Sequence, residues 1–177
     1  MVAVPKLVGE APSCGDLPTA YLIEVSPAVA ADGTAVIGSN DAFEYAVNGD
    51  GNAAVEVPKG RRDLRSPAVS RGRAMFGAHK GRVHTIDLAT GKVLAAAFGE
   101  QTPSRSRSVG VWTSPAIDRD GNVYVGTRLG HIEGFDRAGA LLFDVDTKDT
   151  VDSYPALSAD GTLLIGSSNG LLYAIRD

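Results

Sequence analysis

The sequence predicts an all-β protein built from four consecutive antiparallel units, and three observations lead to this fold class. A Pro-Ala dipeptide followed by Val, Ile or Leu begins at Pro27, Pro67, Pro115 and Pro155, at intervals of 40, 48 and 40 residues. Each dipeptide is followed by a glycine-containing turn and a short apolar run. No segment has the sustained 3.6-residue apolar period that a long helix requires. A regular period of this size is typical of stacked supersecondary units.

Four strands can be placed in order within each repeat. The Pro-Ala strand is followed by a turn at Gly33, Gly72, Gly121 or Gly161, and in three repeats Asp precedes the Gly, a pair that suits a tight hairpin. Second strands, each ending in Gly, are predicted at 35–38, 74–77, 123–126 and 163–166. Third strands follow the next small residue, as at 82–86 and 171–175. Fourth strands are predicted at 53–57, 93–97 and 141–145, so each unit is a four-stranded meander.

Four-stranded units of this length are typical of the blades of a β-propeller. We therefore expect a single domain over residues 1–177, with blades beginning near Ser26, Ser66, Ser114 and Ser153. The fourth repeat lacks an outer strand, and residues 2–9 have the right offset before Pro27 to complete that blade. Three forms remain open: a four-bladed ring in one chain, half of an eight-bladed ring in a homodimer, or part of a longer propeller.

The repeat resembles that of the pyrroloquinoline-quinone-type (PQQ-like) repeat family from about Ser26 to Asp177. The segments that carry the resemblance are Gly170–Ile175 and Asp87–Leu94. The family usually places a Trp after its Thr-Gly-Lys motif to dock one blade on the next, and this chain has Ala95 and Phe143 at those places. The resemblance therefore implies blades that dock more loosely or with different packing. It also implies a periplasmic or extracellular location.

Composition is that of an ordinary globular domain, with 44% hydrophobic and 21% charged residues. The single cysteine, Cys14, excludes a disulfide within the chain. No apolar run reaches the 18 residues typical of a transmembrane helix. The first residues lack the basic start and apolar segment of a signal peptide, so none is expected in this chain.

The net charge of −4 disfavours general nucleic-acid binding, yet residues 59–107 carry eleven basic and three acidic side chains, a local charge of +8. In a meander blade, the links between blades and the turns between second and third strands share one face of the ring. Basic residues in these segments, with Trp112 at the end of the longest link, form the predicted binding face: Arg61, Arg62, Arg65, His79, Lys80, Arg105, Arg107, Trp112 and Arg128. The predicted partner is a protein or a small anionic ligand. The alternatives are dispersed, solvated loop charges and a Trp112 packed at a blade junction.

No catalytic set is evident. A Gly-x-Ser-x-Gly elbow and a phosphate-binding Gly-Lys-Ser/Thr loop are both missing, and His79, His84 and His131 lack paired metal-ligand spacing. The segment 118–122 begins like a calcium loop, but without the further ligands it is better explained as a hairpin turn. We therefore expect no metal or cofactor.

The expected function is that of a non-catalytic scaffold that binds a protein or a small anionic ligand. By resemblance, one alternative is a part of a PQQ-dependent oxidoreductase, although one cysteine cannot form the adjacent disulfide that such enzymes commonly carry. A structural repeat assembly without a ligand is the other alternative.

Overall fold

The computed structural model describes residues 23–41, 43–48, 53–58, 65–78, 82–96, 111 and 113–176. Within these residues the chain forms fifteen β-strands and no helix, which confirms the all-β prediction. Accordingly, the described part contains no helix that could cross a membrane.

The strands form four separate antiparallel sheets, one for each repeat, and in each sheet neighbouring strands follow one another in the chain. The first sheet contains β1 (Ala28–Val29), β2 (Ala35–Gly38), β3 (Phe43–Val47) and β4 (Ala53–Pro58). The second contains β5 (Ala68–Ser70), β6 (Arg73–Ala78), β7 (Arg82–Asp87) and β8 (Val93–Ala96). The third contains β9 (Ala116–Ile117), β10 (Val123–Gly126), β11 (His131–Phe135) and β12 (Leu141–Asp146). The fourth contains β13 (Ala156–Leu157), β14 (Leu163–Gly166) and β15 (Leu172–Ile175). The predicted strands are thus found within one or two residues of their expected bounds.

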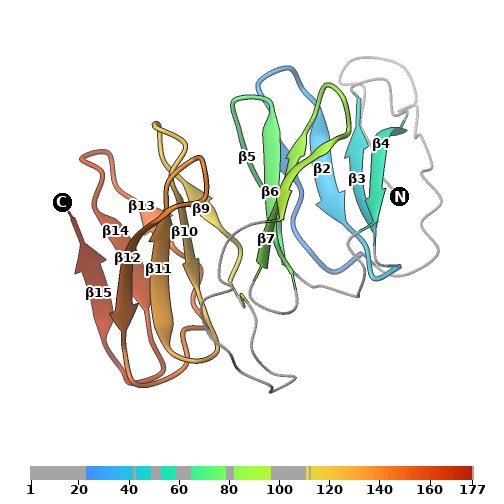
Figure 1. Ribbon diagram of the computed structural model, residues 1–177. Helices are drawn as coiled ribbons and strands as arrows, with labels where there is room; N and C mark the ends of the chain where they lie inside the picture. Colours follow the sequence, from blue (N-terminus) through green and yellow to red (C-terminus); the bar gives the residue numbers. More distant parts are fainter. Residues whose placement is uncertain are drawn as a thin grey trace, which may run out of the picture.

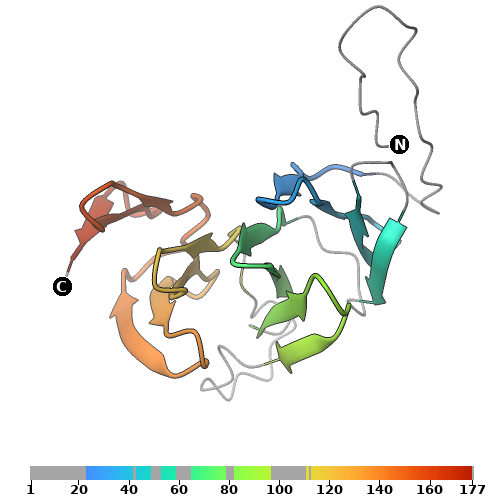
Figure 2. The same ribbon diagram turned by 90° about the horizontal axis from the view of Figure 1, so that it is seen from above.

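The four sheets stand side by side in chain order (Figure 1). Seen from above, they fan out along an open arc, with the first and fourth sheets at its two ends (Figure 2). The short first strands hold the arc together, because β1 contacts β5, β5 contacts β9 and β9 contacts β13. The described residues therefore form a row of sheets that does not close on itself. The strand predicted at residues 2–9 lies outside them, and the fourth sheet has three described strands.

The hairpin turns lie where they were predicted, and in the repeats with Asp-Gly the glycine alone has a positive φ. In the third repeat, the Asp118 amide donates to the Asn122 carbonyl and Gly121 has a φ of 90°, a conformation that glycine adopts without steric cost. The calcium-like segment is therefore a turn, as expected. In the second repeat Arg71 stands where the other repeats have Asp. Its own φ is 49°, so here the residue before the glycine also has a left-handed backbone conformation.

The core consists of apolar clusters between neighbouring sheets. Val36 and Ala46 of the first sheet pack against Ala74 of the second. Between the second and third sheets the buried side chains are Met75, Val83, Val111, Val123 and Val125. Between the third and fourth they are Ile132, Val151, Leu163 and Ile165. The second and third sheets thus each turn one face to the preceding repeat and the other face to the following repeat.

Phe143, at one of the places where the family usually has Trp, contributes to the last of these clusters. Its ring stacks on Tyr124, with centroids 6.0 Å apart, and lies where a Cβ on Gly134 would be. At the junction between the third and fourth sheets, the Phe143 ring therefore lies over a glycine of its own sheet.

Candidate functional site: an arginine-lined groove and an uncovered sheet face

Two of the nine predicted binding residues fall within the described residues. Arg65 is only 9% exposed, and Arg128 lies exposed in the turn between β10 and β11. The other seven lie outside the described residues: Arg61, Arg62, His79, Lys80, Arg105, Arg107 and Trp112. The predicted basic face therefore stays a prediction.

A groove with a volume of about 410 Å³ lies between the second and third sheets. Its lining residues come from β5, β6 and three turns: Ser70, Arg71, Arg73, Met75, Asp120, Gly121, Arg137 and Ala138. The turns that contribute join first to second strands and third to fourth strands. In a meander these turns lie at the opposite end of the strands from the predicted basic face, so this site is a different one.

Three arginines give the groove a surplus of positive charge. Within the described residues, none of Arg71, Arg73 and Arg137 forms an ion pair with a carboxylate. Arg71 donates to the backbone carbonyl of Arg119. The one acidic lining residue, Asp120, lies 3.8 Å from the Arg119 Nε.

The carboxylate opposite Arg73 in the strand ladder, Asp87, is engaged elsewhere. Its Oδ1 accepts hydrogen bonds from the Thr90 amide at 2.8 Å and the Thr90 hydroxyl at 2.7 Å. These bonds lower the pKa of Asp87, so its carboxylate is ionised at neutral pH and stabilises the turn between β7 and β8. The charge of Arg73 also contributes to the lowered pKa of Asp87, but the described residues show no direct ion pair between the two, so Arg73 can still meet an external anion.

Part of the groove lining is apolar. Met75 is buried and belongs to the core cluster between the two sheets. Gly121 is also buried, and a Cβ placed on it would lie 3.4 Å from the Cβ of Arg137. Arginines beside an apolar lining suit a ligand that carries carboxylates on a partly apolar body.

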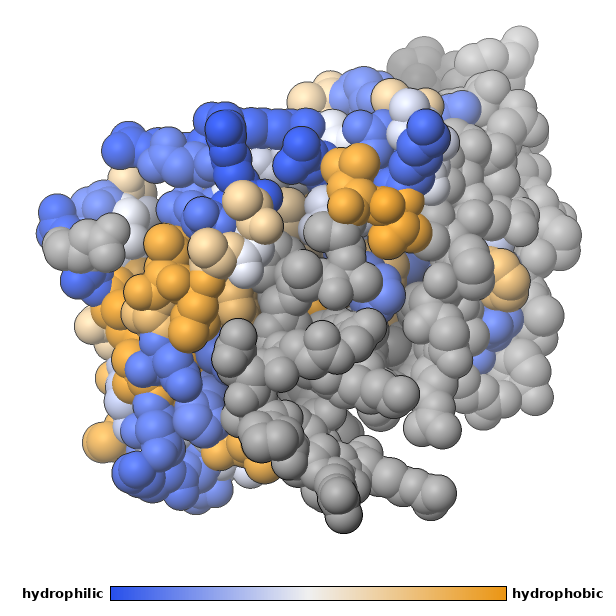
Figure 3. All heavy atoms as spheres, in the orientation of Figure 1, coloured by the Kyte–Doolittle hydropathy of each residue, from blue (hydrophilic) through white to orange (hydrophobic). Residues whose placement is uncertain are grey.

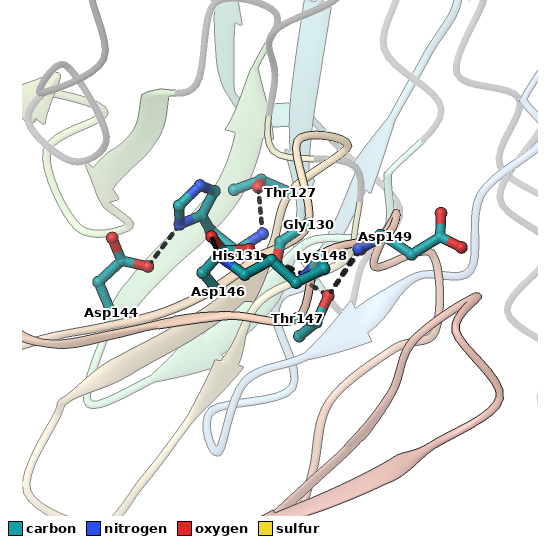
Figure 4. Close-up of polar contacts among 8 residues, drawn as sticks. All are labelled: Thr127, Gly130, His131, Asp144, Asp146, Thr147, Lys148 and Asp149. Atoms are coloured by element: carbon teal, nitrogen blue, oxygen red, sulfur yellow. Dashed lines mark hydrogen bonds and ion pairs between the residues drawn. The ribbon is translucent and has the colours of Figure 1, made fainter.

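A second polar cluster, on the third sheet, is structural in character (Figure 4). His131 Nδ1 lies 2.7 Å from Asp144 Oδ1 across the ladder. The Thr147 amide donates to the Gly130 carbonyl at 2.7 Å, and Lys148 Nζ lies 2.5 Å from Asp146 Oδ2. These contacts hold the turn before β11 against the segment that leads to the fourth sheet. No group of three or more His, Cys, Asp or Glu side chains in the described part of the chain is placed to hold a metal ion.

The fourth sheet leaves one face uncovered. We call the side of this sheet that carries Leu164, Gly166, Leu172 and Ala174 the terminal face. Leu172 is 72% exposed, and Ala174 is exposed as well. Hydrophobic side chains gather over the C-terminal sheets in the space-filling view (Figure 3). Exposed apolar surface on a sheet is typical of an interaction site.

Sequence reasoning missed the groove, although a signal was present. The topological rule that placed the links on one face also places Arg71 and Arg137 together on the other. Tyrosine hydroxyl contacts were missed too. The Tyr45 hydroxyl donates to Asp41 Oδ2 at 2.7 Å, and the Tyr173 hydroxyl accepts from Asn169 Nδ2 at 2.8 Å; the members of each pair are four residues apart.

Comparison with known proteins agrees with this architecture. A family model described as outer membrane protein assembly factor BamB matches residues 26–177. The crystal structure of the computationally designed Ika4 protein is similar, with a TM-score of 0.70, 17% identity and coverage of 89% of this chain and 92% of that chain.

BamB from Moraxella catarrhalis is similar too, with a TM-score of 0.70 and 20% identity over 93% of this chain. The match takes in 53% of the BamB chain, so the present chain spans about half of that protein. No curated protein matches. At these identities the solved structures show likeness of fold.

Proposed function

Because this chain belongs to the PQQ-like repeat family whose model is described as outer membrane protein assembly factor BamB, we propose that it is a non-catalytic propeller scaffold. In this proposal the scaffold binds an acidic segment of a partner protein in the arginine-lined groove. The observation that carries the proposal is the convergence of Arg71, Arg73 and Arg137 from two sheets on one groove.

The exposure of the arginines favours a segment with several carboxylates over a single small anion. All three side chains are exposed, and a solvent-exposed ion pair contributes only about 0–1 kcal/mol. Useful affinity therefore needs several such pairs at once. Two or three carboxylates along an extended segment can meet arginines from both sheets.

The absence of a catalytic role is part of the proposal. The His131–Asp144 pair and its neighbours are accounted for by the contacts that fix a turn and a link. We also propose that the scaffold works outside the cytoplasm, since the family description names an outer membrane assembly factor. The four sheets are proposed to be part of a closed ring.

Fluorescence anisotropy with a labelled Glu-rich peptide of about ten residues tests the binding proposal. We expect binding that weakens as salt is added, and a loss of at least about tenfold in the Arg137→Glu variant. Arg176→Glu makes the same change of charge on the fourth sheet, outside the groove and outside the predicted basic face, and is the matched control. Equal affinity of Arg137→Glu and the wild type would contradict the proposal.

Two further outcomes separate the alternatives. Competition by citrate at concentrations close to those of the peptide would favour a small anionic ligand. Reduction of an electron-accepting dye after addition of pyrroloquinoline quinone and calcium would favour the oxidoreductase.

A further inference from the structure

We infer that the acidic segment proposed for the arginine-lined groove also carries a large apolar side chain, which binds on Leu141 at the outer end of the groove. The inference rests on the proposed function and specifies its partner. That partner is an extended stretch of several carboxylates with a leucine-like residue directly before or after it. Such a segment uses the charge of the groove and the apolar surface beside it at the same time.

A β-bulge decides which way Leu141 faces. The ladder between β11 and β12 pairs Phe143 with Gly134 and Leu141 with Phe135, so Leu142 is the extra residue of the bulge. Residues directly opposite each other in a ladder project from the same face of the sheet. Phe143 packs in the cluster toward the fourth sheet, whereas Phe135 belongs to the cluster toward the second sheet. Because of the bulge, Leu141 therefore faces the second sheet.

The face of the third sheet that carries Leu141 is also the face that borders the groove. Phe135 lies in one buried cluster with Met75, and Met75 is part of the groove lining. Arg137 and Ala138 also line the groove, and they belong to the turn that joins Phe135 to Leu141. Leu141 is therefore the first strand residue after the arginine-bearing turn, one strand farther out than Phe135.

This turn presents one cation and several apolar groups. The Asp136 amide donates to the Ala140 carbonyl at 2.9 Å, and Asp136 Oδ1 accepts from the Ala138 and Ala140 amides at 2.8 Å each. The bond from the Ala140 amide contributes most to a lowered pKa of Asp136. Arg137, Ala138 and Ala140 are exposed. An acidic segment therefore meets a guanidinium and methyl groups here, while the carboxylate of the turn is already hydrogen-bonded to the backbone.

Leu141 has apolar surface to offer, since it is 50% exposed. Val93, the first residue of the outer strand in the second repeat, is 49% exposed. Val93 lies opposite Ile86, which in turn lies opposite Ala74, and Ala74 packs toward the first sheet. Of these two half-covered side chains, Leu141 is thus the one on the groove side.

An apolar contact supplies what exposed ion pairs lack. Ion pairs between exposed side chains contribute little and are weakened by salt. Burial of apolar surface does not depend on charge and is not screened in this way. A segment whose carboxylates reach Arg137 while an apolar side chain covers Leu141 therefore stays bound at higher salt. The same contact fixes which part of the acidic stretch lies in the groove.

Two Glu-rich peptides that differ at one residue test the inference by fluorescence anisotropy. One carries Leu beside the Glu run, and the other carries Gln at the same place. A second pair has this residue at the other end of the run, because an extended segment can enter the groove in either direction. In the tighter pair we expect the Leu peptide to bind the wild type at least about fivefold more tightly than the Gln peptide. This preference should persist as salt is raised, while the affinity of both peptides falls.

Leu141→Ser should abolish the preference and leave the affinity for the Gln peptide unchanged. Val93→Ser removes an equally exposed apolar side chain from the other face of the second sheet and should keep the preference. Circular dichroism verifies that both variants are folded. Equal binding of the Leu and Gln peptides by the wild type in both pairs, or a preference that survives in folded Leu141→Ser, would overturn the inference. Arg137→Glu tests the proposed function separately, because its effect on the Gln peptide depends on the groove alone.

Discussion

Val151 occupies the space that the missing side chain of Gly126 leaves. The valine belongs to the link into the fourth repeat, and its Cγ1 lies where a Cβ on the glycine would be. Thr113 closes the same space from the other side, with its Cγ2 2.9 Å from that position. One small residue therefore fixes how closely two repeats approach.

Gly126→Ala is expected to destabilise the fold by about 1–3 kcal/mol, since the added methyl group has to displace Val151 or the strand. Urea denaturation followed by circular dichroism measures the change. Gly166→Ala is the matched control, because a Cβ there meets only the Ser153 hydroxyl at 3.2 Å. Equal costs at the two glycines would contradict this account of the junction.

Thr113→Val is expected to cost about 1–3 kcal/mol because it removes a buried hydrogen bond while keeping the shape of the side chain. Thr113 is fully buried, and its Oγ1 accepts from the Gly126 amide at 2.8 Å. In the next repeat the Ser153 hydroxyl makes the equivalent bond to the Gly166 amide, at an exposed position. Ser153→Ala should therefore cost less, because water can replace the lost acceptor. Thermal unfolding of the two variants checks the order, and a larger loss for Ser153→Ala would be inconsistent with it.

Asp118→Ala is expected to lower stability by about 1–2 kcal/mol at neutral pH, through loss of the hydrogen bonds that its carboxylate accepts. Oδ1 accepts from the Asp120 and Asn122 amides, and Oδ2 accepts from the Asn122 side chain and the Tyr124 hydroxyl. Burial raises the pKa of Asp118, but these bonds outweigh it and hold the pKa below the usual 3.8.

A lowered pKa means that this contribution is present above pH 3.8 and is lost as the pH falls through the folded-state pKa. The difference between wild type and Asp118→Ala should therefore shrink in acid. Asp120→Ala, at an exposed position in the same turn, is the control and should stay close to the wild type. A difference that is constant from pH 7 to pH 2 would argue against the carboxylate as its source.

Glu133→Gln is expected to stabilise the protein at pH 7. Burial, followed by the charge of Asp144, raises the pKa of Glu133 above 4.5, and His131 only partly opposes this. Its Oε2 is buried with no hydrogen-bond partner. The folded state therefore binds more protons than the unfolded state just above pH 4.5, so stability falls as the pH rises through that window.

Glutamine carries no charge to bury, so the variant should lack this fall. Denaturation midpoints between pH 4 and pH 8 measure it, with Asp152→Asn as the control at an exposed carboxylate. A variant less stable than the wild type at pH 7 would mean that the Glu133 charge is favourable in the fold.

The sequence was sufficient to place the strands because its signals are local. The turn at Gly121 and the strand that follows it depend on residues close together in the chain, whose φ preferences and alternation act over a few positions. Local signals of this kind did not reveal the groove, because its arginines come from two repeats and only the blade topology places them on one face. Arg71 and Arg137 are 66 positions apart and meet only because β5, β6 and the third sheet pack side by side.

The sequence by itself determined the number of repeats, the order of strands and the tight turns, since each follows from a short pattern repeated four times. Only the tertiary structure decided which repeated position is covered. Ile132 and Leu172 have similar local surroundings in the chain, yet one is buried and the other is open to solvent. Burial depends on the sheet that packs opposite, and that neighbour comes from a different repeat.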